Sequence, residues 1–458
     1  MPGSPIKDAY SFLRRFDARK RRLDEAMDEL RKRDTPGIAI GLLDSAVRHA
    51  PLLDLLISHA STVKTNKMER AVLAAMRLGI ASYLRGAPAY AAVNEAVELL
   101  PANHRARGLV NAVTRRVSEI VSIRPITDDE LAGLKRADET AIAELLTPLR
   151  MPFGESAIIQ GRFALFPPDL KGRLALLAGL PGWLYARLES SLEPDEIAKL
   201  CIACAMPPAL WLRIVKGRES QAVKALESIP HHRDDNAIRI QRADGGDIFR
   251  SQAFKDGAFA VQDYAAQLPV IAAKPQPGGR CLDLCAAPGG KTAQLAEAVG
   301  EKGLVLAFDR SDEKLERIQQ NIARLGLSNV ACASGDGTTV KLDGKGRYDL
   351  VLADVPCTNT GVLGRRPDVK ERLREKDVES LGAVQRALLE NAAAHARSGG
   401  TVVYSTCSLL DEENGALVRA FLESKGGDDS GWQFIDERLT LPAPGDHDGG
   451  YYAVLRKP

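Results

Sequence analysis

The chain has 458 residues, of which 45% are hydrophobic and 27% are charged, and its formal net charge is +2. This length exceeds that of an ordinary single domain, and the composition is that of a folded globular protein rather than of a disordered chain. No apolar run is long enough to cross a bilayer and residues 1–5 lead into polar residues rather than a secretory signal, so we expect a cytoplasmic protein without a membrane partner.

Residues 1–145 predict an all-helical domain. Apolar residues recur there at three- and four-residue spacing, for example in residues 71–78. Residues 1–125 hold 21 Lys and Arg against 13 Asp and Glu, so the front of the chain is basic. Such a surface attracts a polyanion through its phosphates, although a solvated basic helix face would have the same composition.

Residues 146–250 predict a small α+β connecting subdomain, with a helix near residues 195–205 and a strand near residues 211–215. Cys201 and Cys204 form a CxxC pair inside an apolar run. No second pair stands at zinc spacing, so we interpret them as core cysteines and expect no metal site. The seven cysteines are scattered and odd in number, which suits a reducing compartment better than a disulfide framework.

Residues 251–458 predict an α/β domain with a Rossmann-like, doubly wound and mostly parallel sheet. Short apolar runs that end in Gly or Asp alternate with helical segments after Gly278. We expect strands at five runs: residues 280–285, 304–308, 330–333, 349–353 and 401–404.

A glycine loop follows the first of these runs. Residues 285–292 read Cys-Ala-Ala-Pro-Gly-Gly-Lys-Thr and lead into a helical segment, whose first N–H groups can hold an anionic group. A phosphate-binding P-loop would need Gly in place of Cys285, and no G-x-G-x-x-G motif for a dinucleotide is present. A simple glycine turn without a ligand is the remaining alternative.

Two acidic residues follow the next two runs. Asp309 lies 19 residues beyond Gly290, where a carboxylate can accept hydrogen bonds from both ribose hydroxyls. Asp336 follows the third run and could receive the amino group of an adenine. Each alone could be a turn-forming Asp, but acids at successive strand ends together predict a nucleoside site.

Two cysteines lie just beyond the last two runs. Asp354 and Cys357 follow the fourth run, and Cys407 follows the fifth. Open α/β sheets bind ligands at the carboxyl ends of their strands. One such cysteine is usually a packed small hydrophobe, whereas two beside a nucleoside pocket indicate a functional role.

These motifs resemble the bacterial RNA cytosine-C5 methyltransferases, and within them the Sun-type enzymes that act on 16S ribosomal RNA. The similarity covers almost the whole chain. In the catalytic half it rests on residues 282–292, on 354–357 (Asp-Val-Pro-Cys), and on 405–408 (Ser-Thr-Cys-Ser) with 412–414 (Glu-Glu-Asn). Residues 91–97 and 108–113 are similar to the helical RNA-binding domain of the antitermination factor NusB.

The resemblance implies S-adenosyl-L-methionine as the cofactor and RNA, specifically 16S ribosomal RNA, as the partner. Cys407 would be the nucleophile that attacks C6 of cytosine, Asp354 would stabilise charge near N3 and N4, and Cys357 would assist product release. The residues implied for cofactor binding are Cys285, Ala286, Ala287, Pro288, Gly289, Gly290, Lys291, Asp309, Asp336 and Asp354.

Arg365 and Arg366 follow Cys357 and are candidate phosphate contacts, with solvated surface arginines as the alternative. We expect a flipped or single-stranded cytosine as the target and a monomeric enzyme. Residues 357–361 depart from the commoner Cys-Ser-Gly-x-Gly pattern, and Glu371 stands where many relatives carry Trp.

Three other functions stay open at this point. One is the same chemistry on transfer RNA, and another is a non-catalytic RNA-binding assembly or antitermination factor. The third, a DNA cytosine methyltransferase, normally uses the cysteine after the fourth strand, so we expect no DNA partner.

Overall fold

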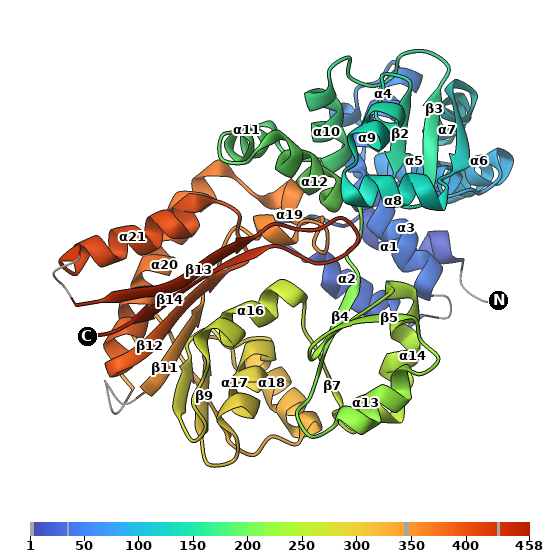
Figure 1. The fold of residues 1–458 in the computed structure, drawn as a ribbon. Helices are drawn as coiled ribbons and strands as arrows, with labels where there is room; N and C mark the ends of the chain where they lie inside the picture. Colours follow the sequence, from blue (N-terminus) through green and yellow to red (C-terminus); the bar gives the residue numbers. More distant parts are fainter. Residues whose placement is uncertain (1–3, 34–35, 343–347, 428–430) are drawn as a thin grey trace. The chain divides into compact units, whose positions relative to one another are not determined.

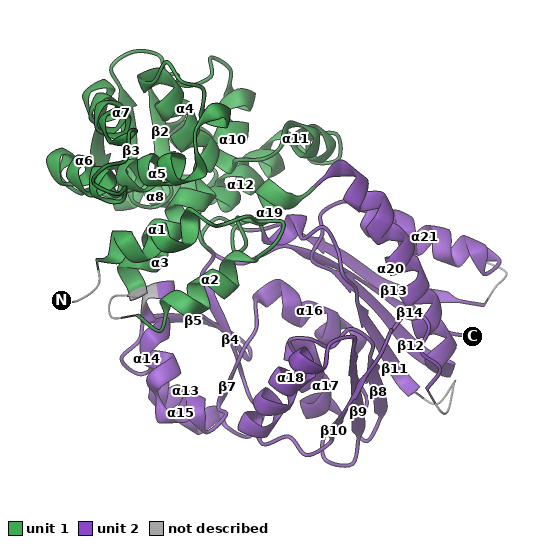
Figure 2. Cartoon of the chain, turned by 180° about the vertical axis from the view of Figure 1, so that it is seen from behind, with its two compact units in different colours: residues 1–207, 363–373, 443–445 green, residues 208–362, 374–442, 446–458 purple. Residues whose placement is uncertain are grey.

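The computed structural model describes residues 4–33, 36–342, 348–427 and 431–458, which form two compact units (Figure 2). Unit 1 comprises residues 1–207, 363–373 and 443–445, and unit 2 comprises residues 208–362, 374–442 and 446–458. The expected boundaries at residues 145 and 250 stay a prediction, because the segment between them is shared by both units. Within the described ranges, no helix is long and apolar enough to cross a membrane.

Unit 1 begins with closely packed helices, in agreement with the helical periodicity of the sequence. In α5, Gly79 lies against α6, where a Cβ would approach the Cβ of Ala96 to 2.4 Å. Glycine therefore allows the two helices to pack closely. The helices are α1 (Pro5–Leu13), α2 (Leu23–Leu30), α3 (Pro36–Arg48), α4 (Ala50–Ala60), η1 (Thr65–Lys67), α5 (Arg70–Leu84), α6 (Ala89–Glu98), α7 (Arg107–Ile120), α8 (Asp128–Arg136) and α9 (Glu139–Leu145).

A small antiparallel sheet interrupts this helical region. Its order is β1-β3-β2, formed by β1 (Val121–Pro125), β2 (Arg150–Phe153) and β3 (Ala157–Gly161). The all-helical prediction for residues 1–145 missed β1, because its partner β3 lies beyond that region and local periodicity carries no signal of it. Three helices follow: α10 (Leu170–Ala178), α11 (Gly182–Glu189) and α12 (Pro194–Ala205), the last confirming the helix expected near residues 195–205.

A short segment from the second half of the chain also belongs to unit 1. Residues 363–373 contain the single-turn helix α19 (Val369–Arg372). The buried Lys370 donates from Nζ to the backbone oxygen of Cys204 at 2.8 Å, and Arg48 donates from Nη1 to the backbone oxygen of Gly364 at 2.6 Å. Buried hydrogen bonds to charged groups are among the stronger ones, so this segment is firmly held against α3 and α12.

Unit 2 starts with a four-stranded antiparallel sheet of order β5-β6-β4-β7, whose core includes Leu212, Ile238 and Phe259. It confirms the strand expected near residues 211–215. The elements of this part are β4 (Leu210–Ile214), α13 (Glu219–Leu226), β5 (His231–Asp234), β6 (Ala237–Ile240), η2 (Arg242–Asp244), α14 (Gly245–Arg250), α15 (Gln252–Lys255) and β7 (Phe259–Val261).

The main sheet has seven strands in the order β10-β9-β8-β11-β12-β14-β13 (Figure 1). The five apolar runs form its parallel strands, so the α/β prediction is confirmed, whereas the antiparallel β14 and β13 were not predicted. The strands are β8 (Arg280–Asp283), β9 (Leu304–Asp309), β10 (Val330–Ser334), β11 (Tyr348–Asp354), β12 (Ala396–Thr406), β13 (Gln433–Thr440) and β14 (Gly450–Arg456).

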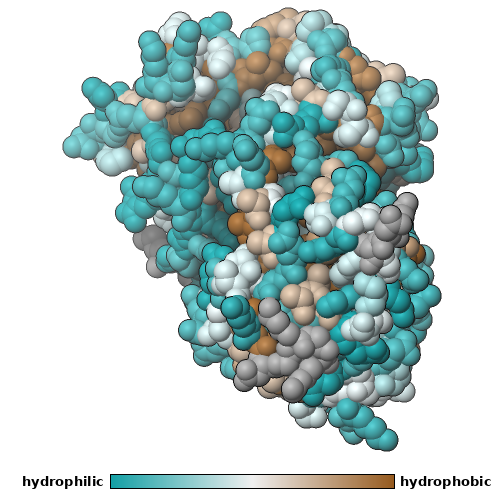
Figure 3. All heavy atoms as spheres, turned by 90° about the vertical axis from the view of Figure 1, so that its left-hand side faces the viewer, coloured by the Kyte–Doolittle hydropathy of each residue, from teal (hydrophilic) through white to brown (hydrophobic). Residues whose placement is uncertain are grey.

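Helices cover both faces of this sheet, which explains why its central strands read as continuous apolar runs. Leu282 packs with α20 and α21, whereas its neighbour Cys281 packs with α16 and α17, because successive side chains of a strand point to opposite faces. The helices are α16 (Tyr264–Ala273), α17 (Gly290–Val299), α18 (Asp312–Leu325), η3 (Thr360–Val362), α20 (Glu375–His395), η4 (Asp411–Glu413) and α21 (Gly415–Ser424). In the face drawn in Figure 3, hydrophobic residues appear only as small patches among hydrophilic ones.

Candidate active site

The carboxyl ends of the parallel strands bring most of the predicted site residues to one edge of the sheet. Asp354, at the end of β11, stands directly opposite Ser405 of β12 in the strand register. Cys357 and Cys407 therefore follow two adjacent strands at nearly the same level. Asp309 ends β9, and Asp336 follows β10.

The glycine loop between β8 and α17 has the backbone geometry that the sequence predicted. Gly289 has a φ of 96°, and a Cβ there would lie 3.1 Å from Ile318 of α18, so other residues fit poorly. It is the N-cap of α17, whose first N–H groups have no partner within the helix. Burial raises the pKa of Cys285, so its thiol stays neutral and the loop presents backbone groups rather than a thiolate.

Asp283 lies beneath this loop and was missed at the sequence level. Its side chain is 1% exposed, and Oδ2 accepts a hydrogen bond from Thr292 Oγ1 at 2.8 Å. Burial raises its pKa to about 7, and Oδ1 has no partner among the described residues. Its sequence signal is an acid at the end of a buried strand, inside the motif of residues 282–292.

The two acids expected to hold a nucleoside lie in open surroundings. Asp309 is half-buried and accepts hydrogen bonds from the backbone N–H groups of Ala287 at 3.1 Å and Ser311 at 3.2 Å. Asp336 is exposed, and both the backbone N–H and the hydroxyl of Thr338 donate to it. These hydrogen bonds lower the pKa of Asp336, so its carboxylate is charged at neutral pH.

Asp354 is held from two sides. Lys291 donates from Nζ to its Oδ2 at 2.8 Å, and the buried Ser405 donates from Oγ to its Oδ1 at 2.7 Å. Burial is the strongest single influence and acts to lower the pKa of Lys291, but the charge and the hydrogen bond of Asp354 together with the neighbouring charge of Asp283 raise the net pKa. Lys291 thus carries a proton at the end of β11, beside the cysteine loops.

The sulfur atoms of Cys357 and Cys407 lie 3.1 Å apart. Cys357 is 7% exposed, whereas Cys407 is half-buried and more open to an incoming group. The hydrogen bond with Cys407 and burial raise the pKa of Cys357 well above its usual range, so Cys357 is a neutral thiol. The pair combines an accessible sulfur with a proton-bearing one.

The buried side chain of Glu413 accepts hydrogen bonds from both cysteine loops and so connects them. Glu413, from η4, is 0% exposed and accepts hydrogen bonds from the backbone N–H of Thr358 at 2.9 Å and from Gln385 Nε2 at 2.8 Å. Its other oxygen accepts from the hydroxyls of Thr358 and Ser408, the residues that follow the two cysteines. The motif at residues 412–414 was visible in the sequence, but its position behind both loops was not.

Four other residues singled out in the sequence belong to unit 1. Arg365 and Arg366 are half-buried within the segment that belongs to unit 1. Burial raises the pKa of Asp368, and the positive charge of Arg366 opposes this rise. Cys201 and Cys204 are buried in α12, where burial raises both pKa values. Within the described residues, no group of three His, Cys, Asp or Glu side chains could hold a metal ion.

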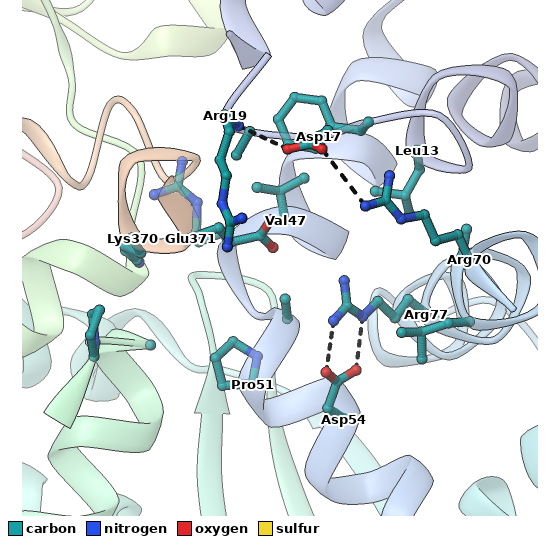
Figure 4. Close-up of a pocket in the computed structure, with 18 of the residues that line it drawn as sticks. Leu13, Asp17, Arg19, Val47, Pro51, Asp54, Arg70, Arg77, Lys370 and Glu371 are labelled. Carbon is teal, nitrogen blue, oxygen red and sulfur yellow. Dashed lines mark hydrogen bonds and ion pairs between the residues drawn. The ribbon is translucent and has the colours of Figure 1, made fainter. Parts of the chain in front are cut away.

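Unit 1 contains a cavity of about 590 Å³ that the sequence did not predict (Figure 4). Arg77 and Asp54 form an ion pair of 2.7 Å in its wall, and Arg70 lies 3.7 Å from Asp17. Arg19 reaches across the opening in the view of Figure 4. None of the predicted catalytic or cofactor residues lines this cavity.

Two family models match the chain. The model described as "16S rRNA methyltransferase RsmB/F" matches residues 270–455, and the NusB family model matches residues 9–119. The first match contains the cysteine pair and the loops with Asp309 and Asp336. The second lies within the helical region of unit 1.

Three similar relatives carry the name "Ribosomal RNA small subunit methyltransferase B". That of Citrobacter koseri is 33% identical over 331 residues, which are 65% of this chain and 76% of the relative. That of Serratia proteamaculans is 37% identical over 290 residues, and that of Escherichia coli is 34% identical over 288 residues. Both of these matches cover 60% of this chain and 66% of the relative's length.

Solved structures share the fold. The crystal structure of PH0851 covers 100% of both chains with a TM-score of 0.73 at 21% identity. A methyltransferase homologue from Pyrococcus horikoshii has a TM-score of 0.54 at 24% identity and covers 62% of this chain and 98% of its own. NSun6 from the same organism, solved with SFG, has a TM-score of 0.53 at 20% identity, covering 61% and 99%.

Proposed function

Because the chain belongs to the RsmB/F family of 16S ribosomal RNA methyltransferases, we propose that it methylates C5 of a cytosine in 16S ribosomal RNA with S-adenosyl-L-methionine as the methyl donor. The observation that carries this proposal is the pair of sulfur atoms 3.1 Å apart at the end of the sheet, beside the ion pair of Lys291 and Asp354. This arrangement offers a nucleophile, a proton carrier and a charged group within one corner.

The residues at the glycine loop fit the cofactor. The loop carries free helix N–H groups, the buried Oδ1 of Asp283 has no described partner, and the carboxylates of Asp309 and Asp336 face open surroundings. When bound, S-adenosyl-L-methionine supplies the methyl group from its sulfonium sulfur. The proposed binding residues are Cys285, Ala286, Ala287, Pro288, Gly289, Gly290, Lys291, Asp309, Asp336 and Asp354.

Cys407 acts first, because C5 of cytosine is a poor nucleophile until a group adds to C6. The Sγ of Cys407 forms a bond to C6, and its proton passes to N3 through Asp354. Lys291 stabilises the Asp354 carboxylate while the proton moves, since their charged groups lie 2.8 Å apart. C5 then carries the electron density needed to accept a methyl group.

Cys357 acts in the release step. After methylation, the proton on C5 leaves and the bond between C6 and Sγ of Cys407 breaks. The neutral thiol of Cys357, 3.1 Å from Cys407, gives its proton to the departing sulfur and takes the proton from C5. Both thiols are thereby restored, and the proton on N3 is released to solvent.

Contacts to the RNA backbone are proposed for Arg365 and Arg366 and for the basic helices of unit 1. The NusB family match to residues 9–119 supports an RNA partner for that region. Phosphate contacts position a strand without reading its bases. Replacing both arginines by Ala should therefore weaken RNA binding for all sequences alike and reduce its salt dependence.

The test is a trapping assay with the full chain, labelled S-adenosyl-L-methionine and cellular RNA, comparing the parent with Cys357→Ala and Cys407→Ala. The Cys357→Ala variant should accumulate a covalent RNA adduct that Cys407→Ala does not form, and the parent should leave 5-methylcytosine in 16S ribosomal RNA. Cys332→Ala is the matched control, because Cys332 is half-buried on β10 away from the sulfur pair.

Other outcomes identify other functions. Methylation confined to transfer RNA would overturn the substrate, and an adduct in Cys407→Ala but not in Cys357→Ala would reverse the thiol roles. RNA binding without affinity for S-adenosyl-L-methionine would indicate a non-catalytic assembly factor.

A further inference from the structure

Asn359 is a departure from the family pattern that lies between the two cysteines. It stands at the third position of the loop 357–361, where the commoner pattern has Gly. Its φ of 63° is in the left-handed region, which glycine adopts freely and Asn tolerates better than most residues. The backbone therefore keeps the conformation that glycine favours, while a carboxamide has been added to the site.

The hydrogen bonds of this carboxamide settle its orientation. Its Nδ2 donates to the backbone oxygen of Cys357 at 2.6 Å, and a carbonyl oxygen can only accept. Oδ1 must therefore face Cys407, whose sulfur lies 3.3 Å away. Because an amide oxygen cannot donate, Cys407 is the donor and is present as a thiol in this arrangement.

The orientation of Asn359 also determines the direction of the hydrogen bond between the two sulfur atoms. The hydrogen of Cys407 is directed to Asn359, so the contact of 3.1 Å between the sulfur atoms is made by Cys357 donating to Cys407. The donors run in one direction, from Cys357 to Cys407 and from Cys407 to Asn359. The raised pKa of Cys357 agrees with this direction, because a donor must keep its proton.

We propose that Asn359 is a positioning residue that holds Cys407 as an oriented, neutral thiol until the target base enters the site. A thiolate at Cys407 would face the lone pairs of Oδ1, so this contact favours the protonated sulfur, whereas the hydrogen bond from Cys357 and the positive charge of Lys291 act in the opposite direction. Loss of the proton is thereby coupled to the arrival of a group that displaces the carboxamide. This inference rests on the proposed role of Cys407 as nucleophile and adds a control on its protonation.

The test measures the thiol itself and needs no methyl transfer. The full chain is treated with iodoacetamide between pH 6 and 10, and alkylation of Cys407 is followed by peptide mass spectrometry. Asn359→Gly removes the acceptor and suits the positive φ, so Cys407 should be alkylated about fivefold faster at pH 7.5, the equivalent of one lost hydrogen bond. Asn359→Asp keeps an acceptor and adds a negative charge, so alkylation should slow by a similar factor.

The opposite signs distinguish positioning from a general structural role, which would move both variants in one direction. Half-buried Cys332 is the internal reference in each digest, and thermal melting shows that both variants are folded. Rates for Cys407 within twofold of the parent in Asn359→Gly would overturn the proposal. Failure of Cys407→Ala to abolish adduct formation would instead sink the proposed function and leave the alkylation result standing.

Discussion

Two parts of the site in unit 2 are built in opposite ways. The cysteine corner comprises the loops that carry Cys357 and Cys407, and the cofactor corner comprises the glycine loop with Asp309 and Asp336. In the cysteine corner, Glu413 is fully buried and binds groups from both loops, so the sulfur atoms are fixed before any substrate arrives. In the cofactor corner, Asp309 is half-buried and Asp336 is exposed, and each is held by N–H groups of neighbouring loop residues. Buried polar contacts thus hold the proposed catalytic cysteines in place, whereas the proposed cofactor-binding acids stay accessible.

The largest effect is expected from Asp354→Asn, because Asp354 is proposed both to bind the cofactor and to carry a proton. The change leaves Lys291, whose side chain is 14% exposed, without its counter-charge and removes the proposed proton carrier near N3. Methyl transfer should fall by about 1000-fold, within the range for loss of a positioned acid or base. Single-turnover rates at saturating S-adenosyl-L-methionine measure this, with circular dichroism as a control for folding. A loss below tenfold would mean that Asp354 holds Lys291 but takes no part in proton transfer.

Glu413→Ala tests the pre-organised side of the comparison. Without the carboxylate, Thr358, Ser408 and Gln385 lose a shared acceptor and the two loops can separate. Methyl transfer should fall by about 100-fold, which is the usual result of displacing reacting groups by 1 Å. The affinity for S-adenosyl-L-methionine, measured by calorimetry, should change by less than about threefold because the cofactor corner is separate.

Glu413→Gln is the matched variant, since it retains one oxygen and the side-chain volume. It should recover most of the activity that Glu413→Ala loses. If Glu413→Ala lost cofactor affinity and activity to the same extent, Glu413 would support both sites, and the cysteine loops would not be held independently of the cofactor site.

The sequence predicted the parallel half of the sheet well because its signal is local. The runs that became β8, β9, β10, β11 and β12 are apolar over several residues and end in Gly, Asp or a polar loop. Their carboxyl ends meet at one edge in any doubly wound sheet, so the positions of Asp309, Asp354 and Cys407 could be expected before the structure.

The rest depended on contacts between residues distant in sequence. In the described part of the chain β1 pairs with β3 alone, and β13 is exposed along most of its length, so neither shows a strong periodic pattern. Glu413 was seen as a motif residue, but only the fold places it against Thr358, 55 residues away. Asn359 was noted as a departure, and its role became visible when its amide contacts were known.

Asp283, which lies beneath the glycine loop, makes the stability of the folded chain depend on pH. Burial raises its pKa from 3.8 to about 7, so between these values the folded chain binds a proton that the unfolded chain does not. Stability is therefore lost as the pH rises through this window, at about 1.4 kcal/mol per unit. Between pH 5 and 6.5 the free energy of unfolding should fall by about 2 kcal/mol more in the parent than in Asp283→Asn. Urea unfolding at the two pH values measures the difference, and equal slopes would show that Asp283 is already ionised.

The smallest effect is expected from Asp336→Asn. Its carboxylate is exposed and its pKa is lowered by the hydrogen bonds from Thr338, which an Asn oxygen can also accept. An exposed contact to an adenine amino group should contribute little, so the affinity for S-adenosyl-L-methionine should weaken by about threefold, against about tenfold for Asp309→Asn in its half-buried position. Calorimetry with both variants measures the ratio. A loss of 100-fold in Asp336→Asn would mean that the loop after β10 closes over the ligand and buries this carboxylate. The cofactor corner would then be exposed only in the free protein. The two corners would differ in when they become ordered, the cysteine corner before and the cofactor corner after the ligand binds.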